Sequence, residues 1–208
     1  AEIAFQAERL HLGIAGGWQD QYAAVFGGFN FIEFDADENI VSPIRVQSDI
    51  ALELEESLVL CDTGIDHHSG NIHDDQKETM TSDAVRKLVK KNVELTFSTR
   101  KYLLRGDLVE FGKCLDISWR LKRNFSSLIS SDYIDSIYEG ALENGALGGK
   151  LLGAGGGGFF IFYVPPFKKH TLISYLTSKN LTIQPFRFEP DGLKTWTSRE
   201  HANHSIGK

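Results

Sequence analysis

The sequence predicts an α+β protein, and three observations lead to this fold class. Short apolar runs of alternating polarity indicate strands, and longer stretches with a 3.6-residue apolar period indicate helices. These elements follow one another in mixed order and include a hairpin, whereas strict alternation of strand and helix would indicate a doubly wound sheet. The 208 residues are enough for one or two domains that each bury an apolar core.

The first quarter of the chain predicts two helices followed by a hairpin. Apolar residues recur at helical spacing over residues 1–12, and a second helix is expected over 18–26, between two glycine clusters. Residues 29–34 and 40–46 flank the polar turn 35–39, so we expect them to pair as antiparallel strands.

Two further strands and a series of helices are expected in the middle of the chain. Residues 51–54 and 58–62 predict strands, the second being an apolar run typical of a buried strand. Ser82 is expected to cap a long helix, and Asp107 with Glu110 resembles a capping box. The expected helices are 69–80, 82–105, 107–123 and 132–144.

The last quarter contains a glycine-rich segment at residues 145–158 and a short strand–helix–strand pattern. We expect the apolar strand 159–164, the helix 167–178 and the strand 181–188, before a polar tail. The phenylalanines of the first of these strands are most simply explained as core residues.

The composition argues against two classes of partner. A formal net charge of −6 argues against binding to nucleic acid or an anionic membrane. No apolar stretch reaches the 18 residues of a membrane span. The two cysteines, Cys61 and Cys114, are typical of a reducing compartment, so we expect a cytoplasmic protein. The sequence leaves monomer and homodimer open.

The run from Gly153 to Gly158 reads G-A-G-G-G-G and admits two interpretations. It contains the dinucleotide pattern G-x-G-x-x-G, but a strand follows it and residues 171–185 contain no Asp or Glu, so we reject that reading. A tight turn between strands and a backbone nest whose N–H groups face an anion both remain. Because consecutive glycines cost chain entropy and a turn needs only one or two, close approach to a ligand is favoured.

Asp20 lies just inside the expected helix 18–26, directly after a glycine pair. Taken alone, such an acid is most simply explained as a partner of the helix macrodipole. The alternative is a carboxylate exposed at a cleft, where it can orient or deprotonate a hydroxyl group.

Together, these segments resemble the GHMP family of small-molecule kinases. Residues 17–22, G-W-Q-D-Q-Y, resemble its G-x-x-D-Q segment, and residues 150–158, K-L-L-G-A-G-G-G-G, resemble its glycine-rich third motif. Residues 103–107 with Phe111 and Gly112 are similar to the helix that opens the family's C-terminal region. The string at 19–30 is most similar to the subgroup of bacterial heptose 7-phosphate kinases.

The resemblance implies a fold and an activity. The fold would be that of GHMP kinases: residues 1–50 would complete the N-terminal nucleotide-binding domain, 51–200 would form a ferredoxin-like C-terminal domain, and 201–208 would be a tail. The activity would be ATP-dependent phosphorylation of a sugar or sugar phosphate at its anomeric hydroxyl. The alternatives are a kinase for fucose, galactose or another small alcohol, a non-catalytic sugar-binding sensor, and a structural module whose glycine run is only a turn.

The resemblance also assigns roles to residues. Asp20 matches the catalytic residue near the acceptor hydroxyl, and Glu8 falls where the family contacts nucleotide-bound Mg²⁺, although a solvated helix face also explains Glu8. Gly155, Gly156 and Gly157 would line the site of the ATP phosphates.

Further residues are implied at the substrate. Gly17 and Gln19 belong to the Asp20 motif, and His67 or His68 would meet a sugar hydroxyl or phosphate from the loop after strand 58–62. A metal site at these histidines is disfavoured because their spacing matches no zinc pattern. Lys122 and Arg123 are further candidates for binding a substrate phosphate, and a solvated helix end is the alternative explanation for them.

Two motifs of the family are missing from these 208 residues. Its first motif and its Pro-x-x-x-Gly-Leu-Gly-Ser-Ser phosphate loop, which grips the triphosphate, do not occur. The chain also begins as the middle of a helix, so we expect a piece of a longer protein. We therefore expect no complete ATP site in these residues alone, and the remainder of the same polypeptide to be their partner.

Overall fold

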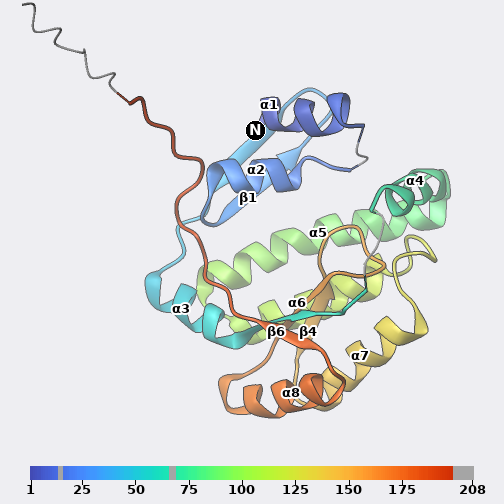
Figure 1. Ribbon diagram of the computed structural model, residues 1–208, viewed down its shortest axis with the longest axis vertical. Helices are drawn as coiled ribbons and strands as arrows, with labels where there is room; N and C mark the ends of the chain where they lie inside the picture. Colours follow the sequence, from blue (N-terminus) through green and yellow to red (C-terminus); the bar gives the residue numbers. More distant parts are fainter. Residues whose placement is uncertain (14–15, 66–68, 199–208) are drawn as a thin grey trace, which may run out of the picture.

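The computed structural model describes residues 1–13, 16–65 and 69–198 (Figure 1). Its helices are α1 (Glu2–Gln6), the π-helical turn η1 (Ala7–His11), α2 (Gln19–Phe26), α3 (Ser48–Ser57), α4 (Ser69–Thr79), α5 (Asp83–Arg105), α6 (Leu108–Lys122), α7 (Asp132–Glu143) and α8 (Pro166–Ser178). Its strands are β1 (Asn30–Phe34), β2 (Asn39–Pro43), β3 (Leu58–Asp62), β4 (Gly148–Leu151), β5 (Phe159–Tyr163) and β6 (Thr182–Gln184). The mixed order confirms the predicted α+β class. None of the helices in these residues is both long and apolar enough to cross a membrane.

The first 46 residues, here called the N-terminal unit, consist of α1, η1 and α2 beside a two-stranded hairpin. Strands β1 and β2 pair antiparallel from Asn30 opposite Pro43 to Phe34 opposite Asn39, which confirms the predicted hairpin. Aromatic rings hold the helices to it: Tyr22 is buried and its ring meets that of Phe34 edge to face at 5.4 Å.

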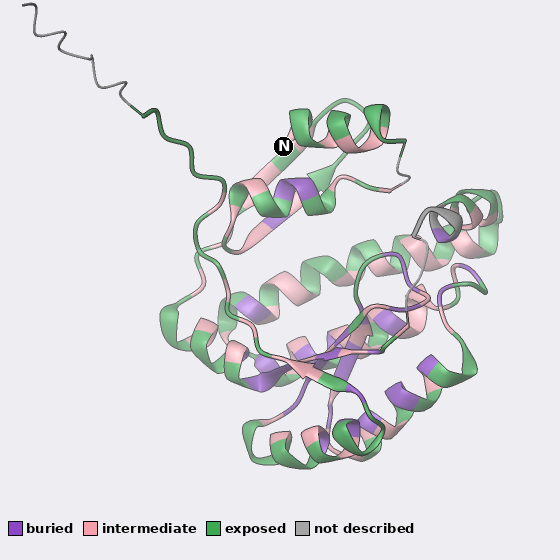
Figure 2. Cartoon of the chain, in the orientation of Figure 1, coloured by how far each residue is buried: buried purple, intermediate pink, exposed green. Residues whose placement is uncertain are grey.

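The remaining elements form the sheet unit, residues 48–184. Its four strands are all antiparallel and lie in the order β4-β5-β3-β6. With α4–α7 between β3 and β4, and α8 between β5 and β6, this is the ferredoxin-like arrangement. Helices cover both faces, so the buried residues in Figure 2 concentrate on the sheet and the helix sides that meet it.

Alternation along the strands divides the core between these two faces. Phe160 and Phe162 pack in one cluster with Tyr138 of α7 and Leu172 of α8. Their neighbour Tyr163 packs in the other cluster with Leu54 of α3, as well as with residues of α5 and α6. The interpretation of the β5 phenylalanines as core is confirmed for Phe160 and Phe162, whereas Phe159 is 38% exposed.

Three predicted elements were wrong in kind or extent. The expected strand 51–54 is part of helix α3, because Ile50 and Leu54 pack against the core at helical spacing while Leu52 is 63% exposed. Strand β4 lies inside the segment expected to be a glycine loop. Strand β6 is three residues long, shorter than the predicted 181–188.

Strand β4 contains glycine because helix α6 lies directly against it. A Cβ atom at Gly148 would lie 2.0 Å from the carbonyl oxygen of Gly112 in α6. Only a residue without a side chain allows this approach. The glycine content at this point therefore reflects packing of a helix on a strand.

The predicted helix caps are correct in position but not in their bonds. Ser82 and Asp107 are the N-caps of α5 and α6, yet neither side chain accepts a capping hydrogen bond. Glu110 pairs with Lys113 at 2.6 Å instead of completing a capping box.

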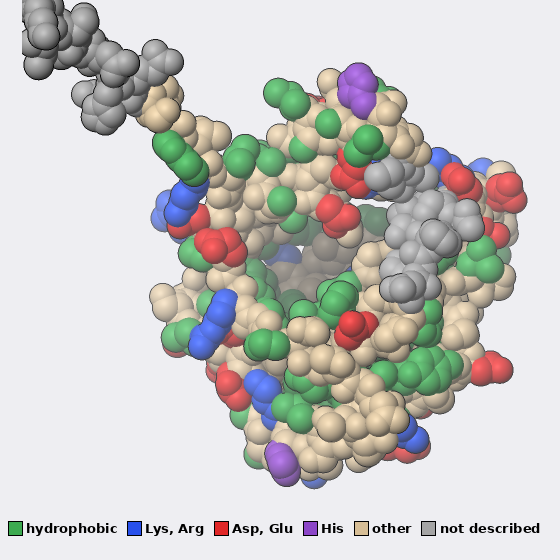
Figure 3. All heavy atoms as spheres, in the orientation of Figure 1, with side chains coloured by type: hydrophobic (Ala, Val, Ile, Leu, Met, Phe, Trp, Pro, Cys, Tyr) green, Lys and Arg blue, Asp and Glu red, His purple; other side chains and the backbone are tan. Residues whose placement is uncertain are grey.

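Two sets of contacts join the N-terminal unit to the rest of the chain. Phe31 of β1 meets Phe97 of α5 at a centroid distance of 5.3 Å, and the Arg100 guanidinium lies 4.7 Å from the Phe31 ring centroid. The segment after β6 also returns past α2, where Leu193 N donates to Val25 O at 2.9 Å. Figure 3 shows a hollow between the two units.

Candidate active site

The glycine loop, residues 152–158, connects β4 to β5 and is fixed by hydrogen bonds from three directions. Gly156 N donates to Ile129 O at 2.9 Å, and Gly158 N donates to Ile65 O at 3.1 Å. Gln76 Nε2 of α4 donates to Ala154 O at 3.2 Å. The loop is therefore a built structure, and its position between two strands agrees with rejecting a dinucleotide motif.

The protein's own backbone explains two of the glycines. A Cβ atom at Gly157 would lie 2.5 Å from the carbonyl oxygen of Ile65, and Gly155 has φ +124° with Ile129 Cα only 3.0 Å from an added Cβ. Close approach is thus required here by protein atoms, which is a different reason from the ligand approach inferred from the sequence.

Several amides of the glycine loop nevertheless remain available to a ligand. Within the described ranges, the N–H groups of Gly153, Ala154, Gly155 and Gly157 donate to no protein acceptor. Three of these residues, Ala154, Gly155 and Gly157, are buried. A buried amide without an acceptor is costly, and several together form the kind of nest that binds anions.

A network around Arg9 organises the N-terminal unit's part of the site. Arg9 Nη1 lies 3.2 Å from Glu8 Oε1, and Arg9 Nη2 donates to Gly17 O at 3.0 Å. Gln21 Nε2 donates to the other oxygen of Glu8. A Cβ at Gly16 would lie 2.5 Å from Arg9 Cζ, so this glycine makes room for the guanidinium. The structure thus brings predicted residues Glu8 and Gly17 together through Arg9, which the sequence reasoning missed.

Asp20 is an exposed carboxylate in the first turn of α2. Its neighbour Gln19 donates from Nε2 to Asp20 Oδ1 at 3.4 Å. In Figure 1 the start of α2 and the glycine loop lie on the sides of the two units that face each other. No hydrogen bond or ion pair among the described residues links Asp20 directly to the glycine loop. The two halves of the predicted site thus belong to facing units and make no direct polar contact in the described chain.

The first residues of the loop that follows β3 are hydrogen-bonded to the glycine loop. Thr63 donates from both N and Oγ1 to Gly158 O at 2.8 Å, and Ile65 supports Gly157 and Gly158 as described above. The predicted substrate residues His67 and His68 come next in the chain and lie outside the described residues.

Two lysines lie at the same end of the sheet. Lys122, at the end of α6, donates from Nζ to Gly153 O. Burial and the charge of Lys150 on β4 lower the pKa of Lys122 to about 7, and burial also lowers the pKa of Lys150. Arg123 differs, because it pairs with Asp135 at 3.3 Å and with Glu139 at 3.6 Å. Of the two predicted cations, only Lys122 contacts the glycine loop.

Glu8 supplies the type of ligand that Mg²⁺ prefers. Magnesium takes oxygen ligands and binds through one or two carboxylates plus substrate phosphates and water. Glu8 is 38% exposed, so its carboxylate can meet a nucleotide-bound ion, but both oxygens already have partners in Arg9 and Gln21. Glu8 therefore fits Mg²⁺ when one of its oxygens exchanges Arg9 or Gln21 for the ion.

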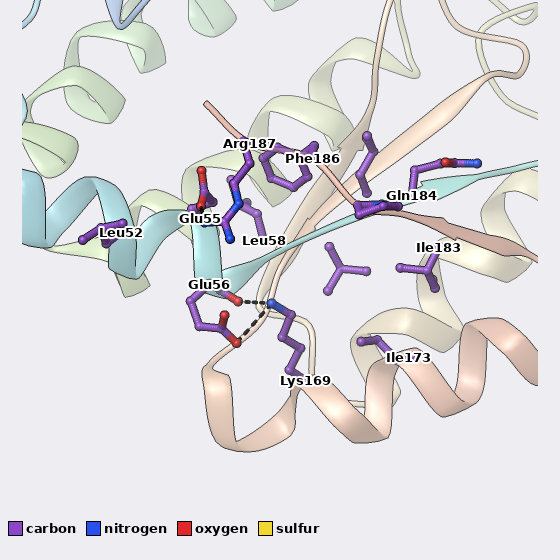
Figure 4. A pocket seen from close by; sticks show the side chains of 13 residues that line it. Leu52, Glu55, Glu56, Leu58, Lys169, Ile173, Ile183, Gln184, Phe186 and Arg187 are labelled. Carbon is purple, nitrogen blue, oxygen red and sulfur yellow. Dashed lines mark hydrogen bonds and ion pairs between the residues drawn. The ribbon is translucent and has the colours of Figure 1, made fainter. Parts of the chain in front are cut away.

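A separate groove of 490 Å³ lies between α3, α8 and β6 (Figure 4). Strand β6 is at the opposite edge of the sheet from β4, which leads into the glycine loop. Its floor is apolar, with Leu60, Ile173 and Ile183, and Lys169 on its rim pairs with Glu56 at 3.2 Å. None of the predicted site residues lines it. The groove is therefore distinct from the candidate site.

Comparison with known proteins places this arrangement in a family. The family model described as GHMP kinases C terminal matches residues 99–179, which run from α5 through the glycine loop to the end of α8. Residues 99–179 therefore correspond to a GHMP kinase C-terminal domain. This confirms the fold class that the sequence predicted from the two motifs.

Individual relatives of this GHMP domain extend the match to nearly the whole chain. D-glycero-alpha-D-manno-heptose 7-phosphate kinase of Campylobacter jejuni is 39% identical over 197 residues, covering 94% of this chain and 58% of the relative. The crystal structure of a D-glycero-D-manno-heptose 1-phosphate kinase from Bacteroides thetaiotaomicron has 32% identity and a TM-score of 0.68, covering 94% of this chain and 55% of that one.

A more distant structure shares the fold alone. L. major mevalonate kinase, in complex with R-mevalonate, has 23% identity and a TM-score of 0.67, covering 85% of this chain and 56% of that one. In each case the chain spans little more than half the length of its relative.

Proposed function

We propose that this GHMP chain is part of an ATP-dependent kinase that phosphorylates a heptose phosphate at its anomeric hydroxyl. The observation that supports this most strongly is the 39% identity to a heptose 7-phosphate kinase across 94% of the chain. The sequence of the Asp20 motif and the built glycine loop are both within that span. The rest of the polypeptide completes the site, because no phosphate loop occurs in these residues.

The proposed mechanism relies on positioning and electrostatics, since phosphoryl transfer needs an aligned acceptor and neutralised charge. Asp20, at the exposed start of α2, orients the acceptor hydroxyl and accepts the proton of that hydroxyl. The free N–H groups of Gly155 and Gly157 hold a phosphate oxygen from the glycine loop. When nucleotide is bound, Mg²⁺ supplies neutralisation of phosphate charge, and Glu8 is the carboxylate of this chain that holds it.

Arg9 has a positioning role in this proposal. Its guanidinium fixes the carbonyl of Gly17 and the carboxylate of Glu8, so the segment that leads into Asp20 and the ligand for the ion are held by one side chain. Gly17 and Gln19 then lie at the acceptor side, next to Asp20. Because Arg9 holds both the Gly17 carbonyl and the Glu8 carboxylate, we expect its loss to disturb the positions of both Asp20 and Glu8.

A phosphoryl-transfer assay on the intact gene product tests the proposal. Heptose 7-phosphate, heptose, fucose and galactose are offered with ATP and Mg²⁺, and the product is examined by ³¹P NMR for an anomeric phosphate. Transfer to heptose 7-phosphate with the highest kcat/KM supports the proposal. Tight sugar binding without turnover would favour the sensor, and preference for an unphosphorylated sugar would favour the fucose or galactose alternative.

A further inference from the structure

Lys122 and Lys150 converge on the glycine loop from two different elements. Helix α6 packs along β4 so closely that a Cβ at Gly148 would lie 2.0 Å from Gly112 O. From Gly112 to Lys122 the helix advances about 15 Å, and from Gly148 to Gly153 an extended chain advances about 16 Å. The two paths end together, where Lys122 Nζ donates to Gly153 O.

The side chain of Lys150 belongs to the same layer as α6. Residues alternate between faces along a strand, so Lys150 shares the face of Gly148, which contacts α6. Its cross-strand partner is Ile161, which packs with the cluster formed by α3, α5 and α6. Both lysines therefore lie in the layer between the sheet and α6, at the end where the glycine loop begins.

Within the part of the chain that the structure describes, this pair of positive charges has no negative partner. Across residues 1–13, 16–65 and 69–198, no carboxylate forms an ion pair with either lysine, and Lys150 makes no hydrogen bond through its ammonium group. Asp116, the acid of α6 that is nearest to Lys122 in the sequence, is already bonded to Arg120 and Tyr138. Two half-buried ammonium groups side by side repel each other, and burial together with this repulsion lowers the pKa of Lys122.

A structural explanation accounts for each lysine singly but not for the pair. A cation at the C-terminus of a helix complements the macrodipole, which suits Lys122. An inward-pointing charge protects an edge strand, which suits Lys150 on β4. Neither role requires the two charges to lie beside a loop whose Gly153 and Ala154 N–H groups also donate to no acceptor in the described chain.

We infer that Lys122 and Lys150, together with the adjoining amides of the glycine loop, form a binding site for a phosphate monoester. A dianionic phosphate would neutralise both ammonium groups and accept hydrogen bonds from the loop. It would thus explain Lys122, Lys150 and the loop amides without an acceptor together. Resting on the proposed function, the inference identifies this group as the phosphate that the acceptor sugar already carries. The terminal phosphate of the nucleotide has the same chemistry and is distinguished by experiment.

Isothermal titration calorimetry on the intact protein tests this site. Heptose 7-phosphate, heptose and ATP with Mg²⁺ are titrated separately into wild type, Lys122→Met, Lys150→Met and the control Lys113→Met, which removes a charge from the other half of α6. We expect Kd for heptose 7-phosphate to rise roughly tenfold to a hundredfold in the first two variants, the value of a lost charged hydrogen bond. The affinity of these two variants for heptose, and the affinity of Lys113→Met for heptose 7-phosphate, should stay within about threefold of wild type.

The outcomes separate the sources of the phosphate and the two proposals. A selective loss of ATP affinity would keep the site and assign it to the nucleotide. Changes below about threefold for both ligands in Lys150→Met would overturn the inference, even if phosphoryl transfer persists. Phosphate binding that depends on Lys150, without transfer to any sugar, would instead overturn the proposed function and leave this site intact.

A measurement on wild type keeps the inference testable if a variant fails to fold. Binding of a dianion beside Lys122 raises its affinity for protons, so heptose 7-phosphate binding at pH 8 should take up protons. Calorimetry in two buffers of different ionisation enthalpy measures this uptake. Lys150→Arg, which retains the charge, should bind nearly as wild type does. Absence of proton uptake together with unchanged binding in Lys150→Gln would count against the site.

Discussion

Arg9 Nη2 donates a 3.0 Å hydrogen bond to the carbonyl oxygen of Gly17, three residues before Asp20. This bond ties the π-helical turn η1 to the glycine segment that leads into α2. Since the same guanidinium pairs with Glu8, the backbone that sets the position of Asp20 and the carboxylate proposed for Mg²⁺ are fixed relative to each other.

Asp20→Asn in the intact protein should lower kcat by about 10²–10⁴-fold, the usual contribution of a general base. The amide keeps the size of the side chain but cannot accept the proton of the acceptor. Steady-state kinetics gives kcat, and nucleotide titration should give an unchanged Kd for ATP.

Asp49→Asn is the matched control for this variant. Asp49 also lies in the first turn of a helix, α3, and is exposed, so its loss removes the same macrodipole interaction away from the hollow. We expect near-normal turnover for it. Equal effects of the two substitutions would return Asp20 to the role of a helix-start acid.

Glu8→Gln should raise the Mg²⁺ concentration needed for half-maximal rate by about tenfold, because a neutral amide is a weaker ligand for a hard cation. Initial rates over a Mg²⁺ series at fixed ATP measure this. Glu33→Gln, an exposed position on β1 of the same unit, serves as the control. An unaltered Mg²⁺ requirement would indicate that Glu8 is only a partner of Arg9 and Gln21.

Gly157→Ala should destabilise the protein by about 1–3 kcal/mol, because the new Cβ would lie 2.5 Å from the backbone oxygen of Ile65. Gly17→Ala should change stability little, since no atom lies within 4 Å of its added Cβ. Chemical denaturation of both variants checks the difference. A Gly157→Ala variant as stable as wild type would mean that the loop can move away from Ile65.

The stability of the ligand-free protein should depend on pH through Lys122. Its pKa is lowered to about 7 in the folded state, so between pH 7 and the ordinary lysine pKa the unfolded chain binds more protons. Stability therefore rises with pH across this window. Lys122→Met should flatten the rise, and thermal unfolding of both proteins at pH 7.0–8.5 measures the difference. This range avoids the opposite effect of the Cys61 thiol, whose pKa is raised to about 12 by burial. Parallel profiles for wild type and Lys122→Met would contradict the assigned pKa.

The sequence was sufficient wherever local pattern and tertiary packing agree. The hairpin of β1 and β2 follows from alternation around a polar turn, and α5 ends at Gly106, whose φ is +73°. The order of the Asp20 motif and the glycine run was sufficient to predict the family. The hairpin, the helix end and each separate motif depend on residues close in the chain, so no tertiary contact was needed to predict them.

Helix α3 and strand β4 could not be obtained from local pattern. The Leu-Glu alternation at residues 52–55 suits a strand, but burial of Ile50 and Leu54 on one side made the segment a helix. Strand β4 was hidden by its glycines, which exist because α6 packs against it. In both cases a partner distant in the chain decides the local structure.

The amino-acid sequence alone determined the fold class, the family and the residues proposed for phosphoryl transfer, because motif chemistry is carried by side-chain type and spacing. Only the tertiary structure decided which of these residues share an environment. It joined Glu8 to Gly17 through Arg9, separated Lys122 from Arg123, and brought Lys122 to Gly153 and Lys150 at the glycine loop. The physical reason is that charge and burial depend on neighbours in space, and packing of α6 along β4 places residues there that spacing in the chain does not reveal.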